Sequence, residues 1–164
     1  MNVLFRAVTY AALFVGLVLI YVPAGLLSWS GIVRPEAIEP LQVAGMGLGA
    51  AGAGIALWCI VTFAFIGKGT PAPFDPPRHL VTQGPYRFVR NPMYIGAGLA
   101  LGSSALFFQS WALLVYTGVF FLMTQLFIVL YEEPALRRTF GSEYESYCRT
   151  VSRWLPGSGS KARD

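Results

Sequence analysis

The stretch of sequence that decides the fold covers residues 91–134 and reads NPMYIGAGLALGSSALFFQSWALLVYTGVFFLMTQLFIVLYEEP. It contains two apolar segments, residues 92–108 and 111–131, which only Gln109 and Ser110 separate. A helix rises about 1.5 Å per residue, and roughly 20 apolar residues cross the hydrocarbon core of a bilayer. The pattern therefore predicts a tight transmembrane hairpin of two helices.

Two further apolar segments, residues 4–29 and 41–66, precede this hairpin. The first stays apolar through Trp29, beyond the point where a cleaved signal peptide stops, so we expect a retained helix bent at Pro23. Hydrophobic residues make up 55% of the chain and charged residues only 12%, about half the usual charged share. The sequence predicts one domain, residues 1–164, of an all-α integral membrane protein with four transmembrane helices.

The basic residues predict how this domain lies in the membrane, because cytoplasmic flanks are enriched in Lys and Arg. With a cytoplasmic N-terminus, eleven of the twelve basic residues fall on one side: Arg6, Lys68, Arg78, Arg87, Arg90, Arg137, Arg138, Arg149, Arg153, Lys161 and Arg163. Only Arg34 falls on the other side. Four spans return the C-terminus to the cytoplasm, so the net charge of +4 faces membrane lipids with anionic headgroups rather than nucleic acid.

The second span contains a G-x-G-x-x-G pattern at residues 47–52. A dinucleotide site needs a strand before such glycines, whereas here they lie inside an apolar helix, so we interpret them as helix-packing positions. Cys59 and Cys148 predict no disulfide framework, and His79 is the only histidine. Two cysteines and one histidine are too few for a structural zinc site, so we expect no metal site.

Residues 67–91 form the only long polar connection, with five prolines and four basic residues. A loop of this length is usually functional, and the prolines favour an ordered one. After the fourth span, Glu132-Glu133-Pro134 is expected to interrupt the helix. Apolar residues then recur at steps of three or four, which predicts an interfacial helix broken at Gly141.

Two groups at the cytoplasmic ends of the hairpin are candidates for binding. Asn91 and Pro92 suit the cap and first position of a helix, whose free N–H groups attract anions, and Arg87 and Arg90 would strengthen that attraction. Glu132 and Glu133 end the fourth span. They either point into water or form an ion pair with Arg137, or one of them binds a cation. Pro134 favours the cation, because its ring leaves the carbonyl of Leu130 free.

The two hairpin helices are antiparallel, so residues 91–94 are expected to face Glu132 and Glu133. The combination predicts a receptor for a zwitterion, such as the headgroup of an amino acid.

Several motifs in their order along residues 77–156 resemble the isoprenylcysteine carboxyl methyltransferase family. They are Gly84-Pro85-Tyr86-Arg87, Arg90-Asn91-Pro92-Met93-Tyr94-Ile95-Gly96, Glu132-Glu133, Phe140-Gly141 with Tyr144 and Tyr147, and Arg153-Trp154-Leu155-Pro156. The family's Arg-His-Pro triplet is Arg-Asn-Pro here, which removes the histidine as ligand or base. The Asn-Pro-Met-Tyr and Glu-Glu-Pro runs also look like phosphatidylethanolamine N-methyltransferases, whose Gly-x-Gly and Glu-Glu motifs match residues 96–98 and 132–133.

The resemblance implies a methyltransferase that holds S-adenosylmethionine between residues 77–98 and 131–156, while a lipid-like acceptor enters between helices. The residues carried over as catalytic are Arg90, Asn91, Tyr94 and Arg153. Those carried over as cofactor-binding are Gly84, Pro85, Tyr86, Asn91, Pro92, Tyr94, Gly96, Gly98, Glu132 and Glu133. Methyl transfer needs mainly alignment and exclusion of water, because the sulfonium is already activated.

Three other functions remain open at this point. A phospholipid N-methyltransferase is favoured by Asn91 and the Glu-Glu-Pro run. A non-catalytic membrane scaffold or lipid-binding protein would tolerate changes at Tyr86, Arg90 and Tyr94. A nicotinamide-dependent reductase lacks a phosphate-binding signal in this sequence.

Overall fold

A computed structural model describes residues 9, 12–13, 15–32, 38–67 and 79–156, and every regular element among them is helical. A π-helix, η1 (Val15–Tyr21), leads directly into α2 (Val22–Trp29), and the change of helix type falls just before Pro23. The long helix α3 (Pro40–Thr62) follows and ends in a second π-helical turn, η2 (Phe63–Gly67). Most of the predicted first span and all of the second are thus helical.

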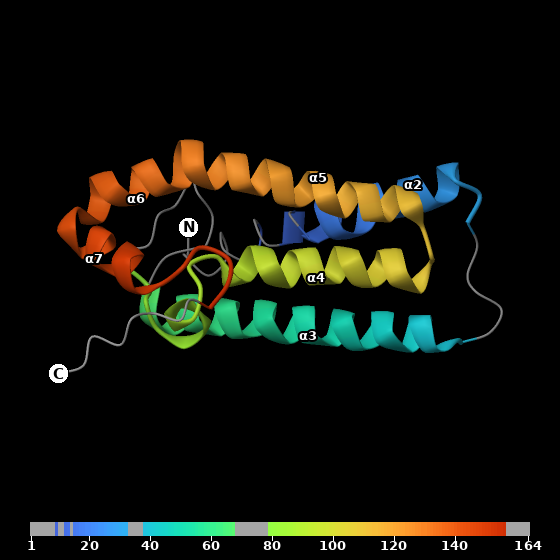
Figure 1. The fold of residues 1–164 in the computed structure, drawn as a ribbon, viewed down its shortest axis with the longest axis horizontal. Coiled ribbons are helices and arrows are strands. Elements are labelled where there is room, and N and C mark those ends of the chain that lie inside the picture. The colour runs from blue at the N-terminus through green and yellow to red at the C-terminus, as the bar shows by residue number, and fades with distance from the viewer. Residues whose placement is uncertain (1–8, 10–11, 14, 33–37, 68–78, 157–164) are drawn as a thin grey trace.

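The predicted hairpin is confirmed as α4 (Pro92–Phe107) and α5 (Trp111–Phe127). Gln109 adopts a φ of 47°, a left-handed conformation that lets the chain reverse within three residues. Ser110 then caps α5, because its side chain accepts a hydrogen bond from the backbone N–H of Leu113. The start of α4 and the end of α5 consequently lie at the same end of the bundle (Figure 1).

Helices α3 and α4 lie side by side and form the most extensive contact between elements (Figure 1). Small residues allow this approach: a Cβ added at Gly52 would lie 2.7 Å from the Gly96 carbonyl oxygen, and one at Gly49 would lie 2.9 Å from Ser103 Oγ. Gly47 and Gly54 meet nothing within 4 Å. The packing interpretation of the glycine pattern is therefore confirmed for the glycines that face α4.

The helix does not break at Pro134, contrary to expectation. The helical segment is continuous from Trp111 to Phe140, through a π-helical turn, η4 (Ile128–Glu132), and α6 (Glu133–Phe140). In this wider turn the Glu133 N–H donates to the carbonyl of Ile128, five residues earlier. A π-turn redistributes the backbone bonds and so accommodates a proline whose missing N–H would disrupt a regular helix.

The predicted break at Gly141 is confirmed. Gly141 has a φ of +52°, which favours glycine, and separates α6 from α7 (Ser142–Thr150). Helix α7 turns back toward the loop before α4, and Tyr144 and Tyr147 are its buried residues. Residues 79–91, α6, α7 and residues 151–156 gather at one end of the bundle (Figure 1).

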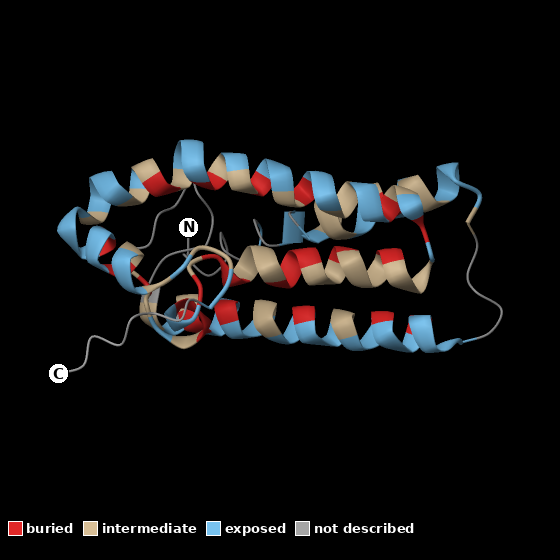
Figure 2. Ribbon diagram, viewed as in Figure 1, coloured by how far each residue is buried: buried red, intermediate tan, exposed pale blue. Residues whose placement is uncertain are grey.

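Two helical segments, Pro40–Thr62 and Trp111–Phe140, are long and apolar enough to cross a membrane. The segments Val15–Trp29 and Pro92–Phe107 are apolar but shorter, so the count of four spans stays a prediction. The outward side of α5 is exposed (Figure 2) and carries Val115, Leu122 and Leu126. An apolar outer surface around a helical bundle is consistent with a lipid environment.

Candidate functional site

The loop before α4 is fastened to the C-terminal part of the chain at the predicted cytoplasmic end. The backbone N–H of Arg90 donates to the Ser152 carbonyl at 2.9 Å, and the Tyr147 hydroxyl donates to the Tyr86 carbonyl at 2.6 Å. Tyr86 lies in the short 3₁₀ turn η3 (Gly84–Arg87), and burial raises the pKa of its phenol well above the usual range. These bonds bring the two halves of the predicted site into contact, as far as the structure describes them, over residues 79–98 and 131–156.

Glu133 is the buried centre of an ion-pair cluster. Its Oε1 lies 2.8 Å from Arg153 Nε and 3.1 Å from Arg90 Nη1, and its Oε2 lies 3.8 Å from Arg137 Nη2. The expected contact with Arg137 is thus present, together with two contacts from distant segments. A buried carboxylate with these partners has its charge compensated within the protein. Glu133 therefore joins the loop, α6 and the C-terminal segment.

Glu132 is in a different environment. Its Oε2 accepts a hydrogen bond from the Tyr94 hydroxyl at 3.0 Å, and no Lys or Arg pairs with it in the part of the chain that the structure describes. Tyr94 lies in the first turn of α4. The expected meeting of the start of α4 with the glutamate pair is observed here. Glu132 is thus a carboxylate whose charge the described residues leave uncompensated.

Arg90 supplies a donor that is not used within the described residues. Its Nη1 contacts Glu133 and donates to Cys148 Sγ at 2.7 Å, while its Nε is buried without a hydrogen-bond partner. Burial lowers the pKa of this guanidinium, whereas Cys148 and Glu133 raise it. The net shift is upward, so the guanidinium stays charged. A buried donor without a partner is costly and indicates a place for an acceptor.

Asn91 occupies the cap position of α4, with Pro92 at the start of the helix, as predicted. Its side chain, however, makes no capping bond and instead donates from Nδ2 to the Arg153 carbonyl at 3.3 Å. The expected side-chain cap is therefore wrong. The amide is buried and holds the C-terminal segment, which leaves the first N–H groups of α4 without a cap from this residue.

The remaining residues carried over from the resemblance lie on the same loop and helix. Pro85 and Pro92 are buried, and Gly84 has a φ of +61° that suits a tight turn. Gly96 faces α3, as described above. A Cβ added at Gly98 would overlap the Phe121 ring, so this ring lies against the helix backbone. Packing accounts for both of these glycines, and their binding of a cofactor stays a prediction.

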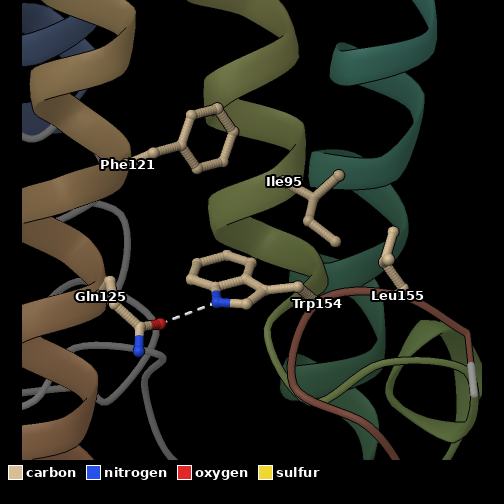
Figure 3. Close-up of a pocket in the computed structure, with 5 residues that line it drawn as sticks. All are labelled: Ile95, Phe121, Gln125, Trp154 and Leu155. Carbon is tan, nitrogen blue, oxygen red and sulfur yellow. Dashed lines mark hydrogen bonds between the residues drawn. The ribbon is translucent and has the colours of Figure 1, made fainter.

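A pocket of about 510 Å³ opens between α4, α5 and the C-terminal segment. Its lining consists of Ile95, Phe121, Gln125, Trp154 and Leu155 (Figure 3). The Trp154 indole N–H donates to Gln125 Oε1 at 2.8 Å. The sequence reasoning missed Gln125, although an amide inside an apolar helix is itself a signal. Trp154 was predicted to matter only as part of the Arg153-Trp154-Leu155-Pro156 motif.

His79 is exposed. Cys59 is buried on α3, and Cys148 is partly buried on α7. Within the described ranges, no group of three His, Cys, Asp or Glu residues is arranged to hold a metal ion.

The family model for phospholipid methyltransferases matches residues 41–143, more than half of the chain. The chain therefore belongs to this family, which includes both the isoprenylcysteine carboxyl methyltransferase type and the phospholipid N-methyltransferase type. The match covers α3, the loop, the hairpin and α6. No curated protein and no solved structure matches the chain. Family membership and the apolar helices together define a membrane methyltransferase.

Proposed function

We propose that this protein transfers the methyl group of S-adenosylmethionine to a lipid-like acceptor at the cytoplasmic face of a membrane, as an enzyme of the isoprenylcysteine carboxyl methyltransferase type. The observation that carries the proposal is the Glu132 carboxylate, which accepts a hydrogen bond from Tyr94 and is not paired with any Lys or Arg among the described residues. An uncompensated carboxylate near the start of a helix suits a ligand that brings its own positive charge.

The described residues fit the zwitterionic end of this cofactor. Glu132 supplies an anion for an ammonium group, while the Arg90 Nε–H and the first N–H groups of α4 supply donors for a carboxylate. Glu133 is already paired with guanidinium groups, so we assign it to holding Arg90 and Arg153 in place. The glutamate pair then has two roles rather than one.

When bound, S-adenosylmethionine supplies a methyl group activated by a sulfonium charge. The protein's contribution is alignment of the cofactor with the acceptor and exclusion of water. Tyr94 fixes the Glu132 carboxylate, and Asn91 and Arg153 hold the C-terminal segment over the start of α4. A carboxylate acceptor needs no base. An ammonium acceptor first has to lose a proton, and neither His79, which is exposed, nor the family's triplet histidine serves it here.

A phospholipid N-methyltransferase is the second candidate, and the description of the matched family favours it. Purified protein with methyl-labelled S-adenosylmethionine and total membrane lipids separates the two. A labelled product that alkaline hydrolysis releases is a methyl ester and supports the leading proposal. A base-stable labelled methylamine supports the second candidate. Native protein that binds no cofactor and labels no product contradicts both and favours a non-catalytic scaffold.

A further inference from the structure

The pocket next to the polar cluster has the chemistry of a hydrocarbon site. Its lining is apolar apart from Gln125, whose side-chain oxygen already accepts the Trp154 indole N–H. Its volume of about 510 Å³ lies within the usual range for small-molecule sites. Leu155, one of the lining residues, is also exposed, so the rim of the pocket includes an apolar side chain at the surface.

Two residues that line the pocket are next in sequence to residues of the proposed cofactor site. Ile95 follows Tyr94, and Trp154 follows Arg153, whose side chain bonds Glu133. Gln125 precedes Glu132 on one continuous helix by roughly 10 Å along the axis. The pocket therefore lies on the bilayer side of the polar cluster, where the tail of a molecule would lie if its head reached Tyr94 and Glu132.

Trp154 gives the pocket a fixed wall. Its indole reaches from the C-terminal segment toward α5, where it meets Gln125 and lies edge-on to Phe121 with ring centroids 5.9 Å apart (Figure 3). Phe121 in turn lies against the backbone of α4 because residue 98 is a glycine. Two aromatic rings, each held by a specific contact, define the width of the space.

We propose that this pocket takes the hydrocarbon tail of the methyl acceptor, and that Trp154, held by Gln125, is the residue that limits the width of that tail. The inference rests on the proposed function, because the pocket gains its role from the methyl-transfer site beside it. A straight acyl chain and a branched isoprenoid chain share the chemistry that the pocket recognises, and Trp154 is the contact that distinguishes their widths.

Photo-crosslinking of the full chain in phosphatidylcholine nanodiscs tests this proposal without relying on methyl transfer. One probe is a phosphatidylethanolamine with a diazirine at the end of an acyl chain, and the other is an S-farnesylcysteine with a diazirine in its tail. We expect at least one probe to label the peptides that contain Gln125 or Trp154. Ile95→Trp, which fills the pocket, should reduce this labelling several-fold, whereas Leu122→Trp, on the exposed side of α5, should not.

Trp154→Ala tests the second half of the proposal. We expect it to increase labelling by the branched probe relative to the straight one, because it removes the wall. Labelling of these peptides by neither probe, or labelling that Ile95→Trp leaves unchanged, would overturn the pocket as a tail site. An unchanged ratio of the two probes in Trp154→Ala would overturn the role of the indole. Cofactor titration of the same samples reports separately on the proposed function.

Discussion

The Tyr94 hydroxyl donates a hydrogen bond of 3.0 Å to Glu132 Oε2, whereas the adjacent Glu133 is paired with arginines. Two consecutive carboxylates within one continuous helical segment thus have opposite environments. One is compensated by the protein, and the other is oriented by a neutral phenol. This difference separates a stability role from a binding role, and each role predicts a different result on substitution.

Glu133→Gln should destabilise the fold. It removes the anion shared by Arg90, Arg153 and Arg137, and the loss of one partner of a buried ion pair costs about 3 to 5 kcal/mol. Thermal unfolding in detergent should show a markedly lower Tm. Glu143→Gln, which removes the same charge from an exposed position on α7, is the control and should leave the Tm unchanged. Equal Tm values for the two variants would contradict the structural role of Glu133.

Tyr94→Phe should weaken cofactor binding while the protein stays folded. The variant keeps the ring and loses only the hydroxyl that orients Glu132, and a hydrogen bond to a charged group contributes about 1.5 to 3 kcal/mol. We expect the Kd for S-adenosylmethionine to rise roughly tenfold or more. Tyr131→Phe, at an exposed ring stacked on Phe127, serves as the control. An unaltered Kd in Tyr94→Phe would argue against the assigned role.

Gly52→Ala should disturb the contact between α3 and α4. The added Cβ would lie 2.7 Å from the Gly96 carbonyl oxygen, so the helices have to separate. Gly54→Ala on the same helix meets nothing within 4 Å and should be neutral or stabilising by up to about 1 kcal/mol, from helix propensity. Unfolding of both variants in detergent measures the difference, and a Gly52→Ala protein as stable as Gly54→Ala would contradict the packing.

Alkaline pH should weaken the bond between α7 and the loop. Burial raises the pKa of the Tyr147 phenol above its usual value, because its neutral form is favoured in the folded protein. Its contribution is therefore complete below the unfolded pKa of about 10 and is lost as pH rises through the folded value. The stability difference between the native protein and Tyr147→Phe should be constant up to about pH 10 and shrink above it. A stability difference that grows above this pH would contradict the predicted role of the neutral Tyr147 phenol.

The positions of the helices follow from the sequence because length and apolarity determine them. Segments 41–66, 92–108 and 111–131 correspond closely to helices, and Gly141 ends one because it adopts a positive φ. The continuous helix through Pro134 was not predicted, since local rules exclude proline from a regular helix but do not show that a π-turn absorbs it.

The division of roles between Glu132 and Glu133 was not predictable either. Sequence proximity suggested only Arg137 as a partner, whereas Arg90 and Arg153 reach Glu133 from segments distant in the chain. The side chain of Asn91 likewise bonds the Arg153 carbonyl instead of capping its own helix. Such choices depend on tertiary contacts that bring three segments together, and local patterns do not contain them.

Isothermal titration of the full chain in detergent with S-adenosylmethionine, comparing the native protein with Glu132→Gln and Glu143→Gln, tests the central claim most directly. Glu132→Gln keeps the shape of the side chain and an acceptor for Tyr94 but removes the charge. We expect the native protein and Glu143→Gln to bind with equal affinity, and Glu132→Gln to lose at least about tenfold without a change in Tm. Native affinity in Glu132→Gln, or no binding by the native protein, would contradict the assignment of this carboxylate to the cofactor.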